Sequence, residues 1–301
     1  MPGTLTPAGA SDVVGRFAPT PSGPLHFGSL LAALASWLDA RARGGRWLLR
    51  LEDIDPPRCP PGAAETILAQ LDAFGLEHDG EIRRQSDQSE LYRHALERLT
   101  ALGLAYPCSC SRKAWQAYPV YPGWCRSGPL HPERDCAWRL RTYLGPDELV
   151  WQDRRLGEQR WPLAALGDVV LKRRDGLWAY QLAVVADDAD QGVTDVVRGV
   201  DLVDNTPWQL RLQEALGLGT PRYLHLPLVV AANGQKLSKQ NLAQALPVHQ
   251  RAVRPLLHEA LGLLGQHCLT PLTPVSEQLA AATRSWSVKR LPPGNVARAA
   301  R

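Results

Sequence analysis

A proline-rich turn between two apolar segments constrains the fold of this chain most strongly. Residues 13–17 are short, apolar and partly β-branched, as in a buried strand. After the turn, leucines recur at helical spacing within residues 30–38. Prolines and glycines exclude regular structure between these segments. The sequence therefore predicts a strand, a turn and a helix.

The start of this helix is suited to binding an anion. Free backbone N–H groups at a helix N-terminus face anionic ligands in nucleotide sites. Gly28 allows a ligand to approach the backbone, and Ser29 is expected to cap the helix. The alternative is an ordinary turn in which His26 hydrogen-bonds a neighbour.

A polar loop far downstream favours the nucleotide site. Lys236 and Lys239 flank Ser238 within residues 233–241, directly after an apolar run. Fixed cations and N–H donors stabilise the charge that gathers on a phosphate during its transfer. The turn and this loop together are more specific than either segment alone.

A second buried strand is expected at residues 47–51. Strand, helix and strand imply a right-handed unit of a parallel sheet, whose ligands bind beyond the carboxyl ends of the strands. Glu52, Asp53 and Asp55 lie at that end, and we expect Glu52, the nearest to the strand, to bind the ligand. The alternative is a solvated turn paired with Arg58.

Two later apolar runs, residues 178–188 and 192–202, are expected to be strands that border the same crevice. They carry Tyr180 and Arg198. An arginine beside an apolar strand is costly to desolvate unless an anion pairs with it, so Arg198 is expected to bind a carboxylate. The alternative is a structural salt bridge to a nearby aspartate, Asp195 or Asp201.

Three cysteines in a short Gly/Pro-rich span indicate a structural Zn²⁺. Thiolates with the spacing of Cys108, Cys110 and Cys125 can occupy corners of a tetrahedron. His131 and Cys136 are chemically better fourth ligands than a phenol, and buried free thiols are the alternative to a metal. Six cysteines in 301 residues fit metal ligation in a reducing compartment better than a disulfide framework.

Composition limits the partners. A net charge of +4 permits nucleic-acid binding without requiring it. The sequence contains neither an apolar run of membrane-spanning length nor a signal-peptide pattern at its start. We therefore expect a cytoplasmic globular protein with no membrane or DNA partner.

Two motifs resemble the signatures of class I aminoacyl-tRNA synthetases, usually written HIGH and KMSKS. They are His26-Phe27-Gly28-Ser29 and Lys236-Leu237-Ser238-Lys239-Gln240, with Ser29 and Gln240 departing from the written forms. Further segments resemble the glutamyl branch: residues 16–23, 50–55, 184–188 and 192–199. The resemblance implies an α/β fold with a Rossmann-type parallel sheet, a small zinc-containing insertion and a short helical C-terminal part.

The resemblance also implies site residues. Catalysis would fall to His26, Lys236 and Lys239, and ATP with Mg²⁺ would contact His26, Gly28 and Lys239. Glutamate would lie against a larger set: Arg16, Phe17, Ala18, Pro19, Thr20, Glu52, Tyr180 and Arg198. Which arginine takes the side-chain carboxylate stays open. By the same resemblance, zinc would be held by Cys108, Cys110, Tyr121 and Cys125.

The implied organisation has five parts: a flexible arm at 1–12, a first Rossmann half at 13–105, a zinc-containing insertion at 106–176, a second Rossmann half with the lysine loop at 177–246, and a short helical region with a solvated basic tail at 247–301. We expect no anticodon-binding domain. This resembles a truncated branch that activates L-glutamate without tRNA and transfers it to queuosine in tRNA(Asp). Alternatives are a chain charging the 3′ end of tRNA(Glu), a non-catalytic binding module and a nucleotidylyltransferase.

Overall fold

The central feature of the computed structural model is a seven-stranded sheet; the structure describes residues 13–231 and 244–298. The sheet order is β3 (Arg83–Arg84), β2 (Arg46–Leu51), β1 (Val14–Phe17), β9 (Asp195–Gly199), β10 (Arg222–Leu226), β6 (Glu148–Asp153) and β7 (Gly157–Pro162). All neighbours pair in parallel except β6 and β7. The predicted α/β class with a parallel sheet is confirmed.

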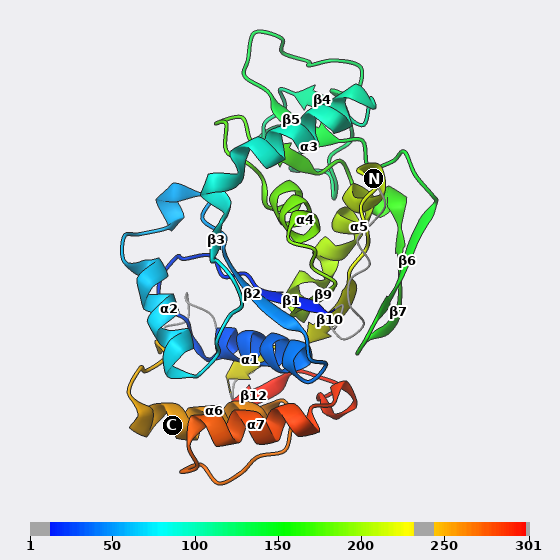
Figure 1. Cartoon of the computed structure of the whole chain (residues 1–301). Helices are drawn as coiled ribbons and strands as arrows, with labels where there is room; N and C mark the ends of the chain where they lie inside the picture. The colour runs from blue at the N-terminus through cyan, green and yellow to red at the C-terminus, as the bar shows by residue number, and fades with distance from the viewer. Residues whose placement is uncertain (1–12, 232–243, 299–301) are drawn as a thin grey trace, which may run out of the picture.

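Helices cover both faces of this sheet (Figure 1). On one face, α1 (Phe27–Arg41) packs against β1 and β9, with α6 (Gln250–Leu263) and α7 (Val275–Ser285) packed on α1. On the other lie α3 (Ser89–Ala101), α4 (Tyr180–Asp190) and α5 (Thr206–Ala215), whose apolar side chains form a second core. The α-helix that remains among the described residues is α2 (Ala63–Ala73). No helix in the described part of the chain has the length and hydropathy needed to cross a membrane.

The predicted strand, turn and helix are present as β1, residues 18–26 and α1. Leu30, Leu34 and Leu38 are buried on α1, which explains why the leucine spacing forms a helix here. The expected cap was wrong, because the N-cap is His26 and not Ser29. The His26 ring nitrogen Nδ1 accepts a hydrogen bond from the backbone N–H of Ser29 at 3.3 Å.

The expected strand over residues 178–188 was also wrong. This run forms α4, and every residue from Gln181 to Asp188 on it is buried. Because the helix is enclosed on all sides, its polar face is missing and its period of 3.6 residues is hidden in the sequence. The consequence for the site is that Tyr180 stands at the N-terminus of a helix.

Residues 105–172 contain a second, three-stranded sheet of β4 (Ala105–Cys108), β5 (Ala137–Leu140) and β8 (Val170–Lys172). Between β5 and β8 the chain returns to the main sheet and adds the β6–β7 hairpin to its edge. The expected solvated tail contains a strand, because β12 (Val296–Arg298) pairs in parallel with β11 (Val229–Ala231). The expected arm at 1–12 lies outside the described residues.

Candidate active site

Two adjacent cavities open at the carboxyl ends of the parallel strands, where ligands of such sheets bind. The first has a volume of about 570 Å³. Seven of the eight side chains expected to contact glutamate line it: Arg16, Phe17, Ala18, Thr20, Glu52, Tyr180 and Arg198. The turn and β2 are tied together here, because the backbone N–H of Glu52 donates to the carbonyl of Pro19 at 3.0 Å.

The second cavity, of about 460 Å³, lies over the N-terminus of α1. Its walls include Pro19, His26 and Gly28, together with Ser29 and residues 226–229. Both cavities are lined by a shared set of residues: Phe17, Thr20, Ala32, Arg58 and Gly199. A molecule in one cavity can therefore touch a molecule in the other.

The expected lysines, Lys236 and Lys239, lie outside the described residues. The segments that flank them in sequence are described. Val229 of β11 lines the second cavity, and Ala245 forms an antiparallel bridge with His26. The backbone N–H of Leu246 also donates to the carbonyl of Leu25 at 2.9 Å. The described residues on either side of the lysines thus lie beside the His26 turn.

A buried network of arginines and carboxylates underlies the first cavity. Asp188 lies between two arginines, at 3.2 Å from Nε of Arg16 and 2.8 Å from Nη1 of Arg50. Arg50 is fully buried and also lies 3.5 Å from Glu52. Burial raises the pKa of Glu52 to about 7, although the charges of Arg50 and Arg16 oppose the rise. Glu52 therefore sits near its ionisation point at neutral pH, and a cation bound beside it would favour the carboxylate.

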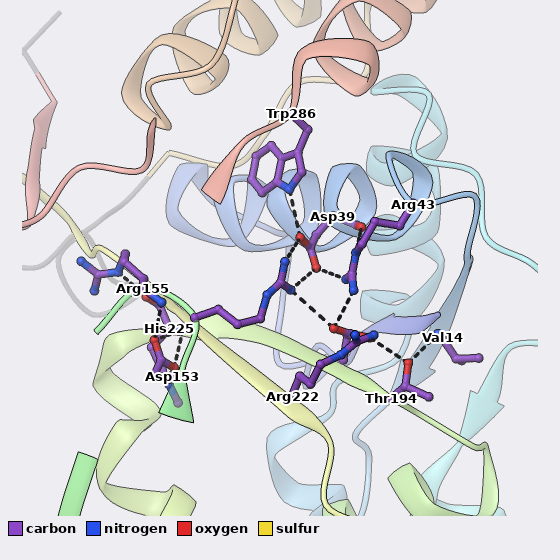
Figure 2. A network of polar contacts seen from close by, with 11 residues as sticks. Val14, Asp39, Arg43, Asp153, Arg155, Thr194, Arg222, His225 and Trp286 are labelled. Carbon is purple, nitrogen blue, oxygen red and sulfur yellow. Dashed lines mark hydrogen bonds and ion pairs between the residues drawn. The ribbon is translucent and has the colours of Figure 1, made fainter. Parts of the chain in front are cut away.

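Arg198 is positioned by neutral side chains. It donates to Oγ1 of Thr206 and Oε1 of Gln209, both at 2.8 Å, and to Nε2 of His225 at 3.1 Å. His225 in turn contacts Asp153 at 2.6 Å, as Figure 2 shows for these two residues. Burial lowers the pKa of His225, so the ring is neutral and accepts from Arg198 while its Nδ1–H donates to Asp153.

The alternative salt bridge for Arg198 is not found at Asp195. That carboxylate pairs instead with Arg43, Arg154 and Arg222. The same polar network reaches Asp39 on α1 and the indole of Trp286 after α7 (Figure 2). Asp195 therefore joins elements at the amino ends of the strands, away from the cavity that Arg198 lines.

The alternative for the acidic turn is not found either. Asp53 accepts hydrogen bonds from Ser86, and Asp55 lies 3.4 Å from Arg173. Among the described residues, no ion pair joins any of the three carboxylates to Arg58. Arg58 instead lines both cavities.

The three expected cysteines form one buried cluster. The Sγ atoms of Cys108, Cys110 and Cys125 lie within 4.8 Å of one another. Zinc–sulfur bonds of about 2.3 Å place tetrahedral sulfur ligands roughly 3.8 Å apart, so the donors fit this metal. Burial raises the pKa of Cys110 to about 11. The pKa of Cys125 falls to about 6 despite burial, because of hydrogen bonds led by the Leu130 backbone, and a metal binds the thiolate.

Tyr121 touches this cluster. Its hydroxyl oxygen lies 3.3 Å from Sγ of Cys108 and 3.6 Å from Sγ of Cys110. The other candidates are elsewhere: Cys136 is not part of the cluster, and the half-exposed His131 ring lies 3.7 Å from Glu133. The geometry therefore favours the phenol over both as the fourth donor.

Sequence reasoning missed four residues that support the cavity: Arg50, Asp153, Asp188 and His225. Asp188 closes the apolar run 178–188 and Arg50 precedes Glu52, so both stood next to recognised positions. For Asp153 and His225 we find no sequence signal. They meet only because β6 pairs with β10 in the sheet.

Comparisons with known proteins identify the fold and the family. The family described as "tRNA synthetases class I (E and Q), catalytic domain" matches residues 12–118 and 131–266. A crystal structure of glutamate-tRNA synthetase from Elizabethkingia anophelis superposes with a TM-score of 0.81 at 23% identity, covering 95% of this chain and 68% of that one. The fold and the family are those of a class I aminoacyl-tRNA synthetase, which is a ligase.

Curated relatives identify the family within this class of synthetases. A glutamyl-Q tRNA(Asp) synthetase from Ectopseudomonas mendocina is 54% identical over 285 residues, covering 93% of this chain and 95% of the relative. One from Pseudomonas aeruginosa PAO1 is 52% identical over 287 residues, with 94% and 96% covered. The chain belongs to the glutamyl-Q tRNA(Asp) synthetase family.

Proposed function

We propose that this enzyme activates L-glutamate with ATP, without tRNA, and transfers the glutamyl group to queuosine in the anticodon of tRNA(Asp), in the cytoplasm. The observation that carries the proposal is the charge pattern of the first cavity. Four arginines (Arg16, Arg58, Arg173 and Arg198) and two carboxylates (Glu52 and Asp55) line it, so cations outnumber anions on its wall. Glutamate carries two carboxylates and one ammonium, so its charges match those of the wall.

In the first step, an α-carboxylate oxygen of glutamate attacks the α-phosphorus of ATP. The new P–O bond replaces the bond to pyrophosphate, and glutamyl-adenylate forms. His26 and Gly28 line the second cavity, where the phosphates would lie at the N-terminus of α1. Lys236, Lys239 and the Mg²⁺ carried by ATP would stabilise the negative charge that develops on the phosphates.

In the second step, a ring hydroxyl of queuosine attacks the acyl carbon of the adenylate. The bond from that carbon to the phosphate oxygen breaks and AMP leaves. The adenylate is already activated, so holding the two reactants together supplies much of the rate. The two cavities share walls, so the adenylate would lie across their junction.

The proposed activation is tested by glutamate-dependent exchange of labelled pyrophosphate into ATP in the absence of RNA. We expect exchange with L-glutamate and far less with L-glutamine, whose neutral amide leaves an arginine unpaired. Exchange that needs added tRNA, or that glutamine supports equally, would contradict the proposal.

We also propose that Cys108, Cys110, Tyr121 and Cys125 hold one structural Zn²⁺. When bound, the ion would supply cross-links between β4 and the loop that follows it. The buried cysteine cluster and the contact of Tyr121 with two of its sulfurs support this set. The first cavity contains none of these residues, so the metal has a structural role in the proposal.

Replacing Cys125 with serine should remove the zinc, because a neutral hydroxyl is a weaker ligand than a thiolate. Zinc content should fall from about one ion per chain to well below half, with a lower Tm. Cys136→Ser is the matched control, and its zinc content should stay at the wild-type level. Full zinc in the Cys125 variant, or equal loss in both, would refute the assigned ligands.

The pKa of Glu52 gives a pH prediction. Above about pH 7 its carboxylate is ionised and pairs with the ammonium of glutamate; below that pH it is protonated and cannot. We expect kcat/KM for glutamate to fall below pH 7, approaching about tenfold per pH unit. Glu52→Gln should have a lower plateau and no such acid limb. If Glu52→Gln still shows the fall in kcat/KM below pH 7, a group other than Glu52 causes it.

A further inference from the structure

A third cavity, of about 1010 Å³, is larger than the proposed glutamate and ATP cavities and is used by neither step. It lies between the β4–β5–β8 sheet, the end of β7 and the beginning of α5. Three tryptophans line it: Trp115, Trp161 and Trp208. The indole N–H of Trp208 donates to the carbonyls of Leu166 at 3.1 Å and Gly167 at 3.2 Å, so this ring is held in place.

This cavity adjoins the glutamate cavity. Arg173 lines both, and the successive residues Asp204 and Asn205 line one cavity each. A polymer whose reacting unit enters the glutamate cavity must place its neighbouring units close by. The third cavity is therefore within reach of the groups that flank the acceptor.

The charges in the cavity favour a neutral, polar group such as a base over a phosphate group. Arginines and aspartates line it in equal number: Arg112, Arg139, Arg173 and Arg174 against Asp135, Asp168, Asp175 and Asp204. Arg112 is exposed and forms no ion pair with a carboxylate in the described part of the chain. Base edges alternate donors with acceptors, and their faces stack on aromatic and guanidinium planes.

We propose that this cavity binds unpaired nucleotides that flank the glutamate acceptor, with a base stacked on Trp161 and its edge within reach of Arg112. The inference rests on the proposed function, because it takes RNA to be the acceptor. A purely apolar ligand would leave the charged side chains without polar partners, and the phosphates of a second nucleoside triphosphate would be repelled by the aspartates. Unpaired bases satisfy both the aromatic walls and the mixed charges.

The test uses an RNA stem-loop that carries the modified nucleoside. Trp161→Leu keeps apolar bulk but removes the stacking face, and it should raise the KM for the RNA about 5- to 100-fold. Arg112→Gln, at an exposed side chain, should raise it less. Glutamate-dependent pyrophosphate exchange, which needs no RNA, should stay unchanged. Matched controls outside the cavity, Trp37→Leu on α1 and Arg284→Gln on α7, should leave the KM for the RNA unchanged.

Abasic substitution at each loop position identifies the stacked base. At that position, removing the base and replacing Trp161 with leucine should together raise the KM for the RNA by less than the product of the two separate increases. Unchanged KM in both cavity variants, or additive losses at every position, would overturn the inference. If Trp161→Leu also weakens pyrophosphate exchange, the substitution has disturbed the fold, and the KM for the RNA of Arg112→Gln then decides whether the cavity binds RNA. Wild-type enzyme that never glutamylates the RNA would contradict the proposed function; normal transfer with unaffected variants would overturn only the cavity assignment.

Discussion

Replacing Arg198 with alanine is expected to raise the KM for glutamate about 10- to 150-fold, which is the loss of one hydrogen-bonded charge pair. The guanidinium is buried and held by Thr206, Gln209 and His225, so it meets the substrate carboxylate already oriented. The KM for ATP should change by less than about twofold, since ATP lies in the second cavity. Steady-state pyrophosphate exchange measures both constants.

Two controls sharpen this test. Arg222→Ala removes an arginine from the neighbouring strand β10, where it pairs with Asp195 and faces away from both cavities. Its KM for glutamate should match that of the wild type. Arg198→Lys keeps the charge but loses the planar fork, so partial rescue is expected. Equal rises in both KM values for Arg198→Ala would show that the side chain maintains the fold and does not bind glutamate.

Replacing His26 should lower kcat for adenylate formation about 100- to 1000-fold, as removal of a single fixed transition-state donor does elsewhere. His26 also caps α1 through its contact with Ser29. Alanine removes both functions, while asparagine keeps a capping oxygen and removes the imidazole. We expect both variants to lose the same catalytic activity.

Stability separates the two functions of His26. The alanine variant should be less stable by about 1 kcal/mol, whereas the asparagine variant should unfold near the wild-type midpoint. Denaturant unfolding measures this difference directly. If His26→Asn retains kcat within about threefold of the wild type, the imidazole has only a capping role.

The sequence predicted the site best where function is carried by short, local motifs. The turn before α1, Glu52 after β2 and Arg198 in β9 each lie where a strand ends or a helix starts, and such ends can be recognised from a few residues. The structure brings them together because parallel strands present the same ends to one edge of the sheet.

Prediction failed where local pattern was ambiguous or contacts were distant. The run that forms α4 is buried all round, so neither a helical nor a strand period dominates it. His225 and Asp153, which position Arg198, are separated by 72 residues and meet through strand order alone. The pairing of β11 with β12 is equally remote in sequence. The sequence of each segment taken alone does not indicate which distant segment it pairs with.

The most direct test of the central claim is transfer of labelled glutamate in the presence of ATP and Mg²⁺. The acceptors are tRNA(Asp) with queuosine, the same tRNA without it, and tRNA(Glu). We predict that only the first becomes labelled and that nuclease digestion releases the label with the modified nucleoside. Label on the 3′-terminal adenosine of tRNA(Glu), or adenylate formation with no transfer to any of the three, would contradict the account.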